Sequence, residues 1–268
     1  MRKWMSTALI FGLAAGSAFA AGYTRQASGD GQKPLILVAG ATGRTGQEVV
    51  KQLLARHYRV RGLVRDRARA VEMFGSSIQY AVGDVREVAT LPAAMKDATY
   101  VICAIGSTRD DPTNSPEQVD YGGVKNLADA AKAAGVRQFV LVSAMGVTRP
   151  DEAVPEGRPS RGRPGTGLWK LKGEDHLRAS GLTYTVVRPA GLGDKPGGLQ
   201  GIKVDQGDKP LEGDPRARMI PRADLATVLV NALGNPDAFG KTFEVTGDAS
   251  TQSVDWAHFF KSLAKDKR

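Results

Sequence analysis

Three glycines at intervals of three residues, Gly40, Gly43 and Gly46, are the residues of this chain best suited to bind a phosphate group. Backbone N–H groups in the first turn of a helix attract anions, because they have no partners within the helix and carry partial positive charge. In such a loop the first glycine allows a tight turn, the second lets the backbone approach a diphosphate, and the third lets helix and strand pack closely. The predicted contacts to a dinucleotide in this loop are Gly40, Thr42, Gly43, Arg44, Thr45 and Gly46.

The segments around these glycines are the elements that such a site needs. The apolar run 34–39 has the length of a strand, and 47–55 has the spacing of an amphipathic helix. A second strand is predicted at 58–64. Strand, glycine turn, helix and strand in this order are typical of the first half of a dinucleotide-binding fold.

Residues after the next strands complete the predicted cofactor site. Arg65 ends the second strand, where dinucleotide-binding folds commonly carry an acid that binds the ribose hydroxyls. An arginine there suits the 2′-phosphate of NADP, and Arg44 could reach the same phosphate, so NADP(H) is favoured over NAD(H), although Asp66 could pair with either arginine. Asp84 could accept a hydrogen bond from the adenine amino group, cap the helix that follows, or do both. The other predicted contacts are Val85, Ala104, Ile105, Gly106 and Lys172.

Composition limits the classes of function. With 268 residues, 41% hydrophobic and 24% charged, the chain suits one folded α/β domain and not a disordered protein. The net charge of +9 is not gathered in a basic helix or a basic–aromatic module, so no nucleic-acid partner is predicted, and an anionic ligand explains the charge as well. The single cysteine, Cys103, excludes an intramolecular disulfide, and the three histidines form no ligand pair, so no metal site is predicted.

The N-terminus has the form of a secretory signal peptide. Its first three residues are positive, residues 4–19 carry no charge, and Ala18-Phe-Ala20 satisfies the small-x-small cleavage rule. We expect a signal peptide at 1–20, a flexible segment at 21–33 and a single exported domain at 34–268, in the periplasm; an uncleaved membrane anchor is the alternative. Export conflicts with the glycine loop, because nicotinamide cofactors are made in the cytosol and a chain exported unfolded cannot carry one.

The rest of the chain completes a doubly wound α/β order. Further strands are predicted at 78–82, 100–104, 138–142 and 183–189. Helices are predicted between them at 67–74, 86–95, 117–134 and 168–180. The segment 151–167, rich in Pro, Gly and Arg, is predicted to be a lid or an insertion. The fold class is therefore a doubly wound parallel-sheet Rossmann fold.

A small C-terminal cap is predicted to follow this sheet within residues 190–268. Its expected elements are a strand at 201–205, a helix at 222–233, a strand at 242–246 and a final helix at 254–264. We expect the cap to lie beside the carboxyl ends of the strands, where ligands bind in this architecture.

Several motifs in order resemble one family. They are the glycine loop with its G-x-x-G-x-x-G spacing, Val119-Asp-Tyr-Gly-Gly-Val-Lys-Asn-Leu127, Val142-Ser-Ala-Met-Gly146, Lys172-Gly-Glu174, Ser180-Gly-Leu-Thr-Tyr-Thr-Val-Val-Arg-Pro189 and Ile220-Pro-Arg-Ala-Asp-Leu-Ala226. Over residues 34–247 the chain resembles the atypical short-chain dehydrogenase/reductases of the NAD(P)H-binding, NmrA-like group. The resemblance implies a Rossmann fold, NADP(H) binding and, by default, a reductase. The group also includes sensors, assembly factors and redox-inactive members.

The resemblance implies two catalytic residues and reveals that a third is missing. Active members of the group use a Tyr four residues before a Lys, with a Ser at the end of the fifth strand. Ser143 matches the Ser, and Lys172 matches the Lys that also holds the nicotinamide ribose. The tyrosine position is Leu168, and the residue four before Lys170 is Thr166. The chain thus resembles the tyrosine-lacking branch of the group.

Three interpretations of the missing tyrosine stay open. The proton is donated by Tyr121, by Ser143 or by water held by Lys172; the substrate is a quinone or flavin; or the protein binds its cofactor without chemistry. The first hypothesis is an NADP(H)-dependent oxidoreductase that reduces a small carbonyl or quinone-like substrate. The alternatives are a non-catalytic sensor, scaffold or assembly factor, and a sugar-nucleotide epimerase-like enzyme. The expected partner is a small-molecule substrate, with no transmembrane partner, and the expected state is a monomer or homodimer.

Overall fold

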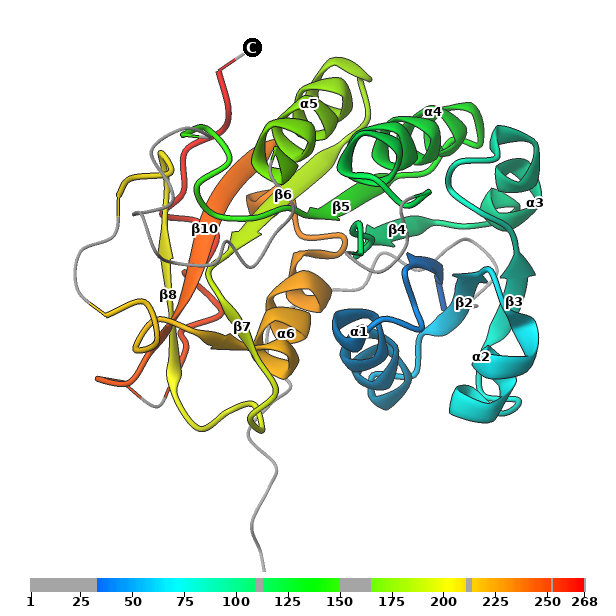
Figure 1. The fold of residues 1–268 in the computed structure, drawn as a ribbon. Helices are drawn as coiled ribbons and strands as arrows, with labels where there is room; N and C mark the ends of the chain where they lie inside the picture. The colour runs from blue at the N-terminus through cyan, green and yellow to red at the C-terminus, as the bar shows by residue number, and fades with distance from the viewer. Residues whose placement is uncertain (1–32, 109–112, 150–164, 211–213, 252, 268) are drawn as a thin grey trace, which may run out of the picture.

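The computed structural model describes residues 33–108, 113–149, 165–210, 214–251 and 253–267. Within these ranges, one sheet has the strand order β3-β2-β1-β4-β5-β6-β10-β8, and β7 pairs with β9 in a second sheet (Figure 1). The main sheet is parallel except for β8, which runs antiparallel to β10. The order of the first six strands, 3-2-1-4-5-6, confirms the predicted Rossmann fold.

The strands of the predicted Rossmann core begin and end within two residues of their predicted positions. The core strands span Leu35–Ala39 (β1), Arg59–Val64 (β2), Gln79–Val82 (β3), Tyr100–Cys103 (β4), Gln138–Val142 (β5) and Tyr184–Pro189 (β6). The later strands span Leu192–Gly193 (β7), Gly201–Asp205 (β8), Ile220–Pro221 (β9) and Lys241–Asp248 (β10). Both β1 and β5 are buried at every position. Central parallel strands are covered on both faces and therefore form continuous apolar runs rather than alternating patterns.

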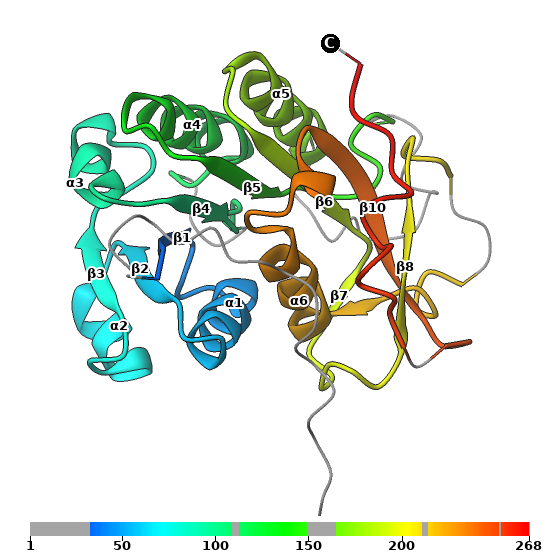
Figure 2. The same ribbon diagram turned by 180° about the vertical axis from the view of Figure 1, so that it is seen from behind.

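Helices cover both faces of the sheet (Figures 1 and 2). They span Arg44–Ala55 (α1), Arg67–Phe74 (α2), Leu91–Met95 (α3), Val124–Ala133 (α4), Thr166–Ala179 (α5) and Arg222–Ala232 (α6), with 3₁₀ turns at Val88–Thr90 and Pro236–Ala238 and a π-helical turn, η2, at Glu117–Gly123. Ile36 and Val38 of β1 pack in the layer of α1, α2 and α6. Leu37 and Ala39 pack in the layer of α3, α4 and α5. Strand β1 therefore delivers Gly40 between two packed layers, at the carboxyl edge of the sheet.

The C-terminal part is arranged differently from the predicted cap. Strand β10 joins the main sheet beside β6, β8 extends that sheet further, and α6 packs against α1. These elements therefore belong to the main layers. The cap therefore consists of the small β7–β9 sheet and the loops around it (Figure 1).

The predicted helix at 254–264 is wrong. Turns occupy this stretch, and Phe259, Phe260 and Leu263 are buried. The ring of Phe243 on β10 meets both phenylalanines, with centroids 6.3 and 5.8 Å away. The Lys241 ammonium donates a hydrogen bond of 2.8 Å to the Phe260 carbonyl. In a helix, that carbonyl would instead accept a backbone N–H from four residues further along the chain. The apolar spacing that predicted a helix instead serves packing of turns onto the sheet.

Several predicted segments lie outside the described residues. They are the signal peptide at 1–20, the segment 21–33 except for Lys33, and the lid at 151–167 except for its last three residues. In the described part of the chain, no helix is both long and apolar enough to cross a membrane.

A buried ion cluster anchors α5 to the sheet. Arg188 of β6, 5% exposed, donates to both carboxylate oxygens of Glu174 on α5, at 3.0 and 2.6 Å. It also donates to Glu244 of β10 at 3.1 Å, and burial raises the pKa of Glu244. Arg178 donates to Glu174 from the next turn of α5, at 2.7 Å. The cluster fixes α5, and with it the side chains that α5 turns toward the sheet edge.

Replacing Arg188 with methionine is expected to lower the free energy of unfolding by about 3–5 kcal/mol, because the buried Glu244 would lose its cation and Glu174 would keep only Arg178. Urea denaturation measures the loss. Lys125→Met is the control, since it removes only an exposed partner of Asp129 and is expected to change stability by about 0.5 kcal/mol or less. Equal effects of the two substitutions would contradict a stabilising role for the cluster.

Candidate functional site

The glycine loop is constrained by backbone contacts that no other residue type permits. Gly40 has a φ of +82°, and a Cβ atom on it would lie 2.7 Å from the Ala104 carbonyl oxygen. A Cβ atom on Gly46 would lie 2.0 Å from the Gly40 carbonyl oxygen. The Gly43 N–H donates to that same oxygen at 3.0 Å, and Gly43 and Arg44 are exposed. The loop therefore presents the start of α1 to solvent, with no side-chain cap, as a phosphate-binding turn requires.

The structure separates the roles of the charged residues after β2. The carboxylate of Asp66 accepts the Arg69 N–H at 3.1 Å and caps α2, and within the described residues it forms no ion pair with Arg65 or Arg44. Arg65 is exposed. Arg44 is paired instead with Asp194, at 3.1 Å. Arg65 is thus available to an anionic ligand at the carboxyl end of β2, the position predicted for the 2′-phosphate of NADP.

Asp84 forms a local clamp with Arg86. The two side chains approach to 2.6 Å, and Asp84 also accepts the Arg86 N–H at 2.9 Å. Hydrogen bonding from the Arg86 side chain lowers the pKa of Asp84, against the opposing effect of burial. The carboxylate is thereby kept ionised and able to accept a further hydrogen bond. Whether that bond comes from adenine stays a prediction.

The wall formed by the residues after β3 and β4 is close-packed. A Cβ atom on Gly123 of η2 would lie 2.6 Å from the Val85 side chain and 3.1 Å from Ile105. The Val85 carbonyl accepts the Asn126 amide at 2.9 Å. Gly106 is exposed. Residues 104–106 and Val85 therefore lie along the carboxyl edge, next to Gly40, and their contact with a dinucleotide stays a prediction.

An ion pair that the sequence did not predict lies beside this wall. Lys170 of α5 contacts Asp120 of η2, with 2.7 Å between Nζ and Oδ1. Asp120 is 1% exposed, and its other oxygen accepts the Ser107 N–H at 3.2 Å, directly after Gly106. The Lys170 side chain keeps 17% of its surface exposed. A cation thus lies at the sheet edge, held by a buried carboxylate, while its ammonium can still meet a ligand.

Gly173 makes the approach of α5 to η2 possible. A Cβ atom at this position would lie 2.6 Å from the Asp120 carbonyl oxygen. Gly173 is one helical turn after Lys170, so both face the same side of α5. Side chains larger than hydrogen would separate the helices and pull Lys170 from Asp120. π-Helical turns such as η2 occur frequently at functional sites.

Ser143, the predicted catalytic serine, lies at the end of β5 in the same region. It is 5% exposed, and its hydroxyl is buried without a hydrogen-bond partner among the described residues. The loop after it is held by Asp208, which accepts the N–H groups of Gly146 and Thr148 at 2.6 and 2.9 Å. A buried hydroxyl without a partner is costly unless a ligand uses it.

Lys172, the other predicted catalytic residue, is not brought to the site. It is exposed on the outer surface of α5, and its ammonium lies 4.2 Å above the Trp169 ring. The Tyr121 ring also packs near Trp169, with 6.0 Å between ring centroids. Leu168 is 40% exposed. The lysine that faces the sheet edge is Lys170, and the residue four before it is Thr166, so the tyrosine is missing in this register as well.

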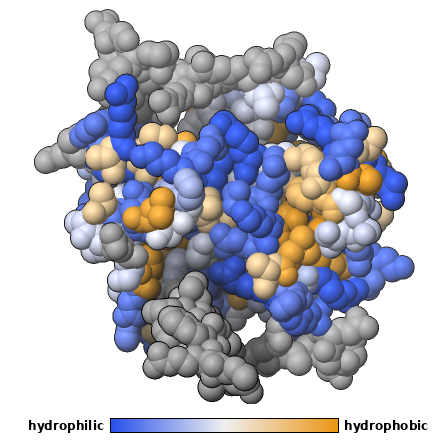
Figure 3. Space-filling model, turned by 90° about the horizontal axis from the view of Figure 1, so that it is seen from below, coloured by the Kyte–Doolittle hydropathy of each residue, from blue (hydrophilic) through white to orange (hydrophobic). Residues whose placement is uncertain are grey.

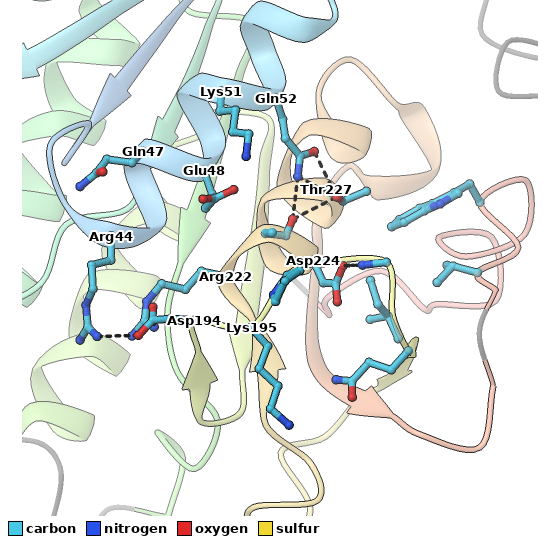
Figure 4. A pocket seen from close by; sticks show the side chains of 18 of the residues that line it. Arg44, Gln47, Glu48, Lys51, Gln52, Asp194, Lys195, Arg222, Asp224 and Thr227 are labelled. Carbon is cyan, nitrogen blue, oxygen red and sulfur yellow. Dashed lines mark hydrogen bonds and ion pairs between the residues drawn. The ribbon is translucent and has the colours of Figure 1, made fainter. Parts of the chain in front are cut away.

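An open groove of about 990 Å³ runs along the seam between α1 and α6 (Figure 4). The Gln52 amide closes its floor by donating to the Ala223 carbonyl and the Thr227 hydroxyl, at 2.6 and 2.9 Å. Ile202, Val254 and Trp256 line its far end. The molecular face seen from below is hydrophilic over much of its centre (Figure 3). The described residues contain no group of three or more His, Cys, Asp or Glu arranged to hold a metal ion.

Comparison with known families identifies the family of this chain. The model of the NAD(P)H-binding family matches residues 40–236. The chain belongs to this family. Its match begins at Gly40 and includes Ser143, Asp120 and Lys170. NAD(P)H binding is therefore a property of the family, and the matched segment begins in the glycine loop.

Curated relatives include reductases. The chain is 32% identical to the sanguinarine reductase of Eschscholzia californica, over 80% of this chain and 89% of that protein. It is 32% identical to the NAD(P)H azoreductase of Xenophilus azovorans, over 86% and 74%. A chloroplastic, uncharacterized protein of Arabidopsis thaliana is 38% identical over 78% of this chain and 68% of that one. By their names, two of these relatives are reductases and the third is a chloroplast protein.

The fold is shared with solved structures at lower identity. A putative NAD-dependent epimerase/dehydratase from Bacillus halodurans superposes with a TM-score of 0.69 at 24% identity, over 81% of this chain and 95% of that one. At this identity the similarity establishes the Rossmann fold alone.

Proposed function

We propose that this chain is an NAD(P)H-dependent reductase that prefers NADPH. The observation that carries the proposal is the Asp120–Lys170 pair, with 2.7 Å between Nζ and Oδ1. The Ser107 N–H contacts the other oxygen of Asp120, and Ser143 follows the strand β5 that pairs with β4. A cation and an unpartnered hydroxyl at the ligand-binding edge of a dinucleotide-binding sheet are suited to stabilising charge on a reduced substrate. The names of the two reductase relatives support the same class.

Each residue has a role that follows from its position. NAD(P)H, when bound, supplies the hydride. The N–H groups at the start of α1 bind the diphosphate, and Arg65 binds the 2′-phosphate. Lys170 binds the ribose hydroxyls and stabilises the negative charge that develops on the acceptor, while the Ser143 hydroxyl donates a hydrogen bond to the accepting atom. Asp120 holds Lys170 in place.

The missing tyrosine favours an acceptor that does not depend on a positioned proton donor. Neither Leu168 nor Thr166 can take that role. Reduction of a quinone-like or azo compound leaves a delocalised anion on oxygen or nitrogen, which an ammonium stabilises until solvent water donates the proton. We therefore propose that conjugated acceptors are better substrates than simple carbonyls, and the azoreductase relative supports this preference.

A second candidate is a protein that binds the cofactor without turnover, as a sensor or assembly factor. The absence of tyrosine at both registers favours it.

For the N-terminus, we propose a targeting segment at 1–20. The two candidate destinations are export and plastid import, and the chloroplastic relative supports the second. The location of a fluorescent reporter fused to residues 1–33 distinguishes them.

The test is a titration of the full chain with NADPH and NADH, followed through nucleotide fluorescence, and then a screen of azo, quinone and carbonyl acceptors for NADPH oxidation. We expect tighter binding of NADPH than of NADH, and turnover of conjugated acceptors. Binding without turnover of any acceptor would establish the second candidate. Absence of binding by either nucleotide would refute both.

A further inference from the structure

The short sheet of β7 and β9 brings two charged side chains together from distant parts of the chain. Its parallel register pairs Gly193 with Pro221. The residues that directly follow the two strands are Asp194 and Arg222, and their side chains form an ion pair. Arg222 is also the first residue of α6, and its side chain is only 12% exposed. The cap thus holds this arginine in a fixed position.

Arg44 reaches the same carboxylate from the glycine loop. Its Nη1 lies 3.1 Å from Asp194 Oδ2, and Arg222 contacts Oδ1, so one carboxylate lies between two guanidinium groups (Figure 4). Arg44 is the first residue of α1 and directly follows Gly43. Two cations facing one anion leave an excess positive charge at the start of the helix that binds the diphosphate. Other charged residues along the groove are Glu48, Lys51, Lys195 and Asp224.

We infer that Arg44 and Arg222 form a binding site for a phosphate group of the dinucleotide, and that Asp194 competes with the ligand for this site. The inference rests on the proposed dinucleotide binding and adds to it a residue of α6 that is not among the predicted cofactor contacts. Arginine suits this role because its planar guanidinium binds phosphate oxygens in pairs.

Asp194 can be displaced from Arg44 because that ion pair is exposed, whereas its other partner, Arg222, is largely buried. The Asp194 side chain is 62% exposed and that of Arg44 is 70% exposed. Ion pairs so open to water contribute little to stability. The diphosphate as a whole and the 2′-phosphate each carry about two negative charges, against one on a carboxylate, and each has more oxygens to share between two arginines. The ligand phosphate is therefore expected to replace the carboxylate.

Displacement would link the ligand to the cap. Asp194 begins the loop that continues to Gly198, whose N–H donates to Asp224 on α6 at 2.7 Å. A phosphate bound between Arg44 and Arg222 joins the glycine loop to α6 directly and releases Asp194 from both. Of these contacts, the one between Gly198 and Asp224 would then remain to hold the loop 194–198. Nucleotide binding is therefore expected to change the mobility of this loop.

The experiment is titration of the full chain with NADPH and NADH at several salt concentrations. We expect Asp194→Asn to bind NADPH about two- to fivefold more tightly than the unchanged chain, and Arg222→Gln to bind it more weakly by a similar factor. Both effects should shrink as salt rises. Asp205→Asn is the matched control, because it loses an exposed carboxylate paired with Lys209, at 3.3 Å, on a strand of the same region. Thermal melting confirms that each variant is folded.

The two nucleotides identify which phosphate is bound. Effects on NADPH and NADH alike would assign the site to the diphosphate, and effects on NADPH alone would assign it to the 2′-phosphate; both results support the inference. If Asp194→Asn and Arg222→Gln bind NADPH like the Asp205→Asn control, the inference is overturned while the proposed function stands. If the unchanged chain binds neither nucleotide, the proposed function fails and the inference fails with it.

Discussion

Substitution of Gly46 by alanine is expected to abolish dinucleotide binding and to destabilise the fold by about 4 kcal/mol or more, the range of severe core disruptions. The added Cβ atom would lie 2.0 Å from the Gly40 carbonyl oxygen and 2.8 Å from the Ala41 Cα atom. Both are backbone atoms of the turn, so α1 can relieve the overlap only by moving away from β1. That movement would carry the anion-binding N–H groups with it.

Urea denaturation and NADPH titration of the variant measure the two effects. Gly167→Ala is the matched control, since its Cβ atom would lie 3.8 Å from its nearest neighbour, an ordinary contact. Alanine in place of glycine in the first turn of α5 is expected to be neutral or to stabilise by up to about 1 kcal/mol. If Gly46→Ala retained nucleotide binding, the close approach of α1 to the turn would not be required for the site.

Replacement of Lys170 by methionine is expected to reduce kcat/KM for NADPH-dependent reduction by about 100- to 1000-fold, the usual loss when one charge-stabilising group is removed. The same change would leave Asp120, which is 1% exposed, without its cation. We therefore expect a loss of stability of about 3–5 kcal/mol as well. Steady-state kinetics and urea denaturation report on the two separately.

A double variant separates catalysis from stability. Asp120→Asn with Lys170→Met removes both charges, so stability should recover in part while activity stays low. Lys172→Met is the matched control, because Lys172 is an exposed lysine two positions along the same helix that lies over Trp169. It is expected to retain full activity. Loss of activity in Lys172→Met and not in Lys170→Met would restore the assignment that the family resemblance implied.

The contrast between these lysines shows where sequence reasoning stops. The motif Lys172-Gly-Glu174 matches the family pattern, but motif matching does not fix the rotation of the helix about its axis. The buried positions of α5 are Gly173, Glu174 and Leu177, and Lys170 falls on the Gly173–Leu177 stripe at helical spacing. This stripe favours Lys170 as the lysine that faces the sheet. The burial of Asp120 is harder to predict from the sequence, because its sequence signal is an acidic residue among apolar residues on one helix face.

The Rossmann core could be predicted because its signals are local. Strand β5 and helix α2 have the predicted limits, since apolar runs and turn residues define them without reference to the rest of the chain. The C-terminal third depends on long-range contacts. The pairing of β10 with β6 joins residues that α6 and the strands β7, β8 and β9 separate, and the turns at 254–264 exist because two phenylalanines pack on Phe243. No local pattern contains that information.

The thiol of Cys103 offers an internal reporter of how the sheet opens. It is the single cysteine of the chain, it is fully buried at the end of β4, and burial raises its pKa to about 12. A thiol reagent can modify it only when β4 separates from its neighbours, so the labelling rate counts opening events at the sheet edge that carries the site. Ligands that close this edge should slow the labelling, which gives a screen for binding that needs neither turnover nor an engineered probe.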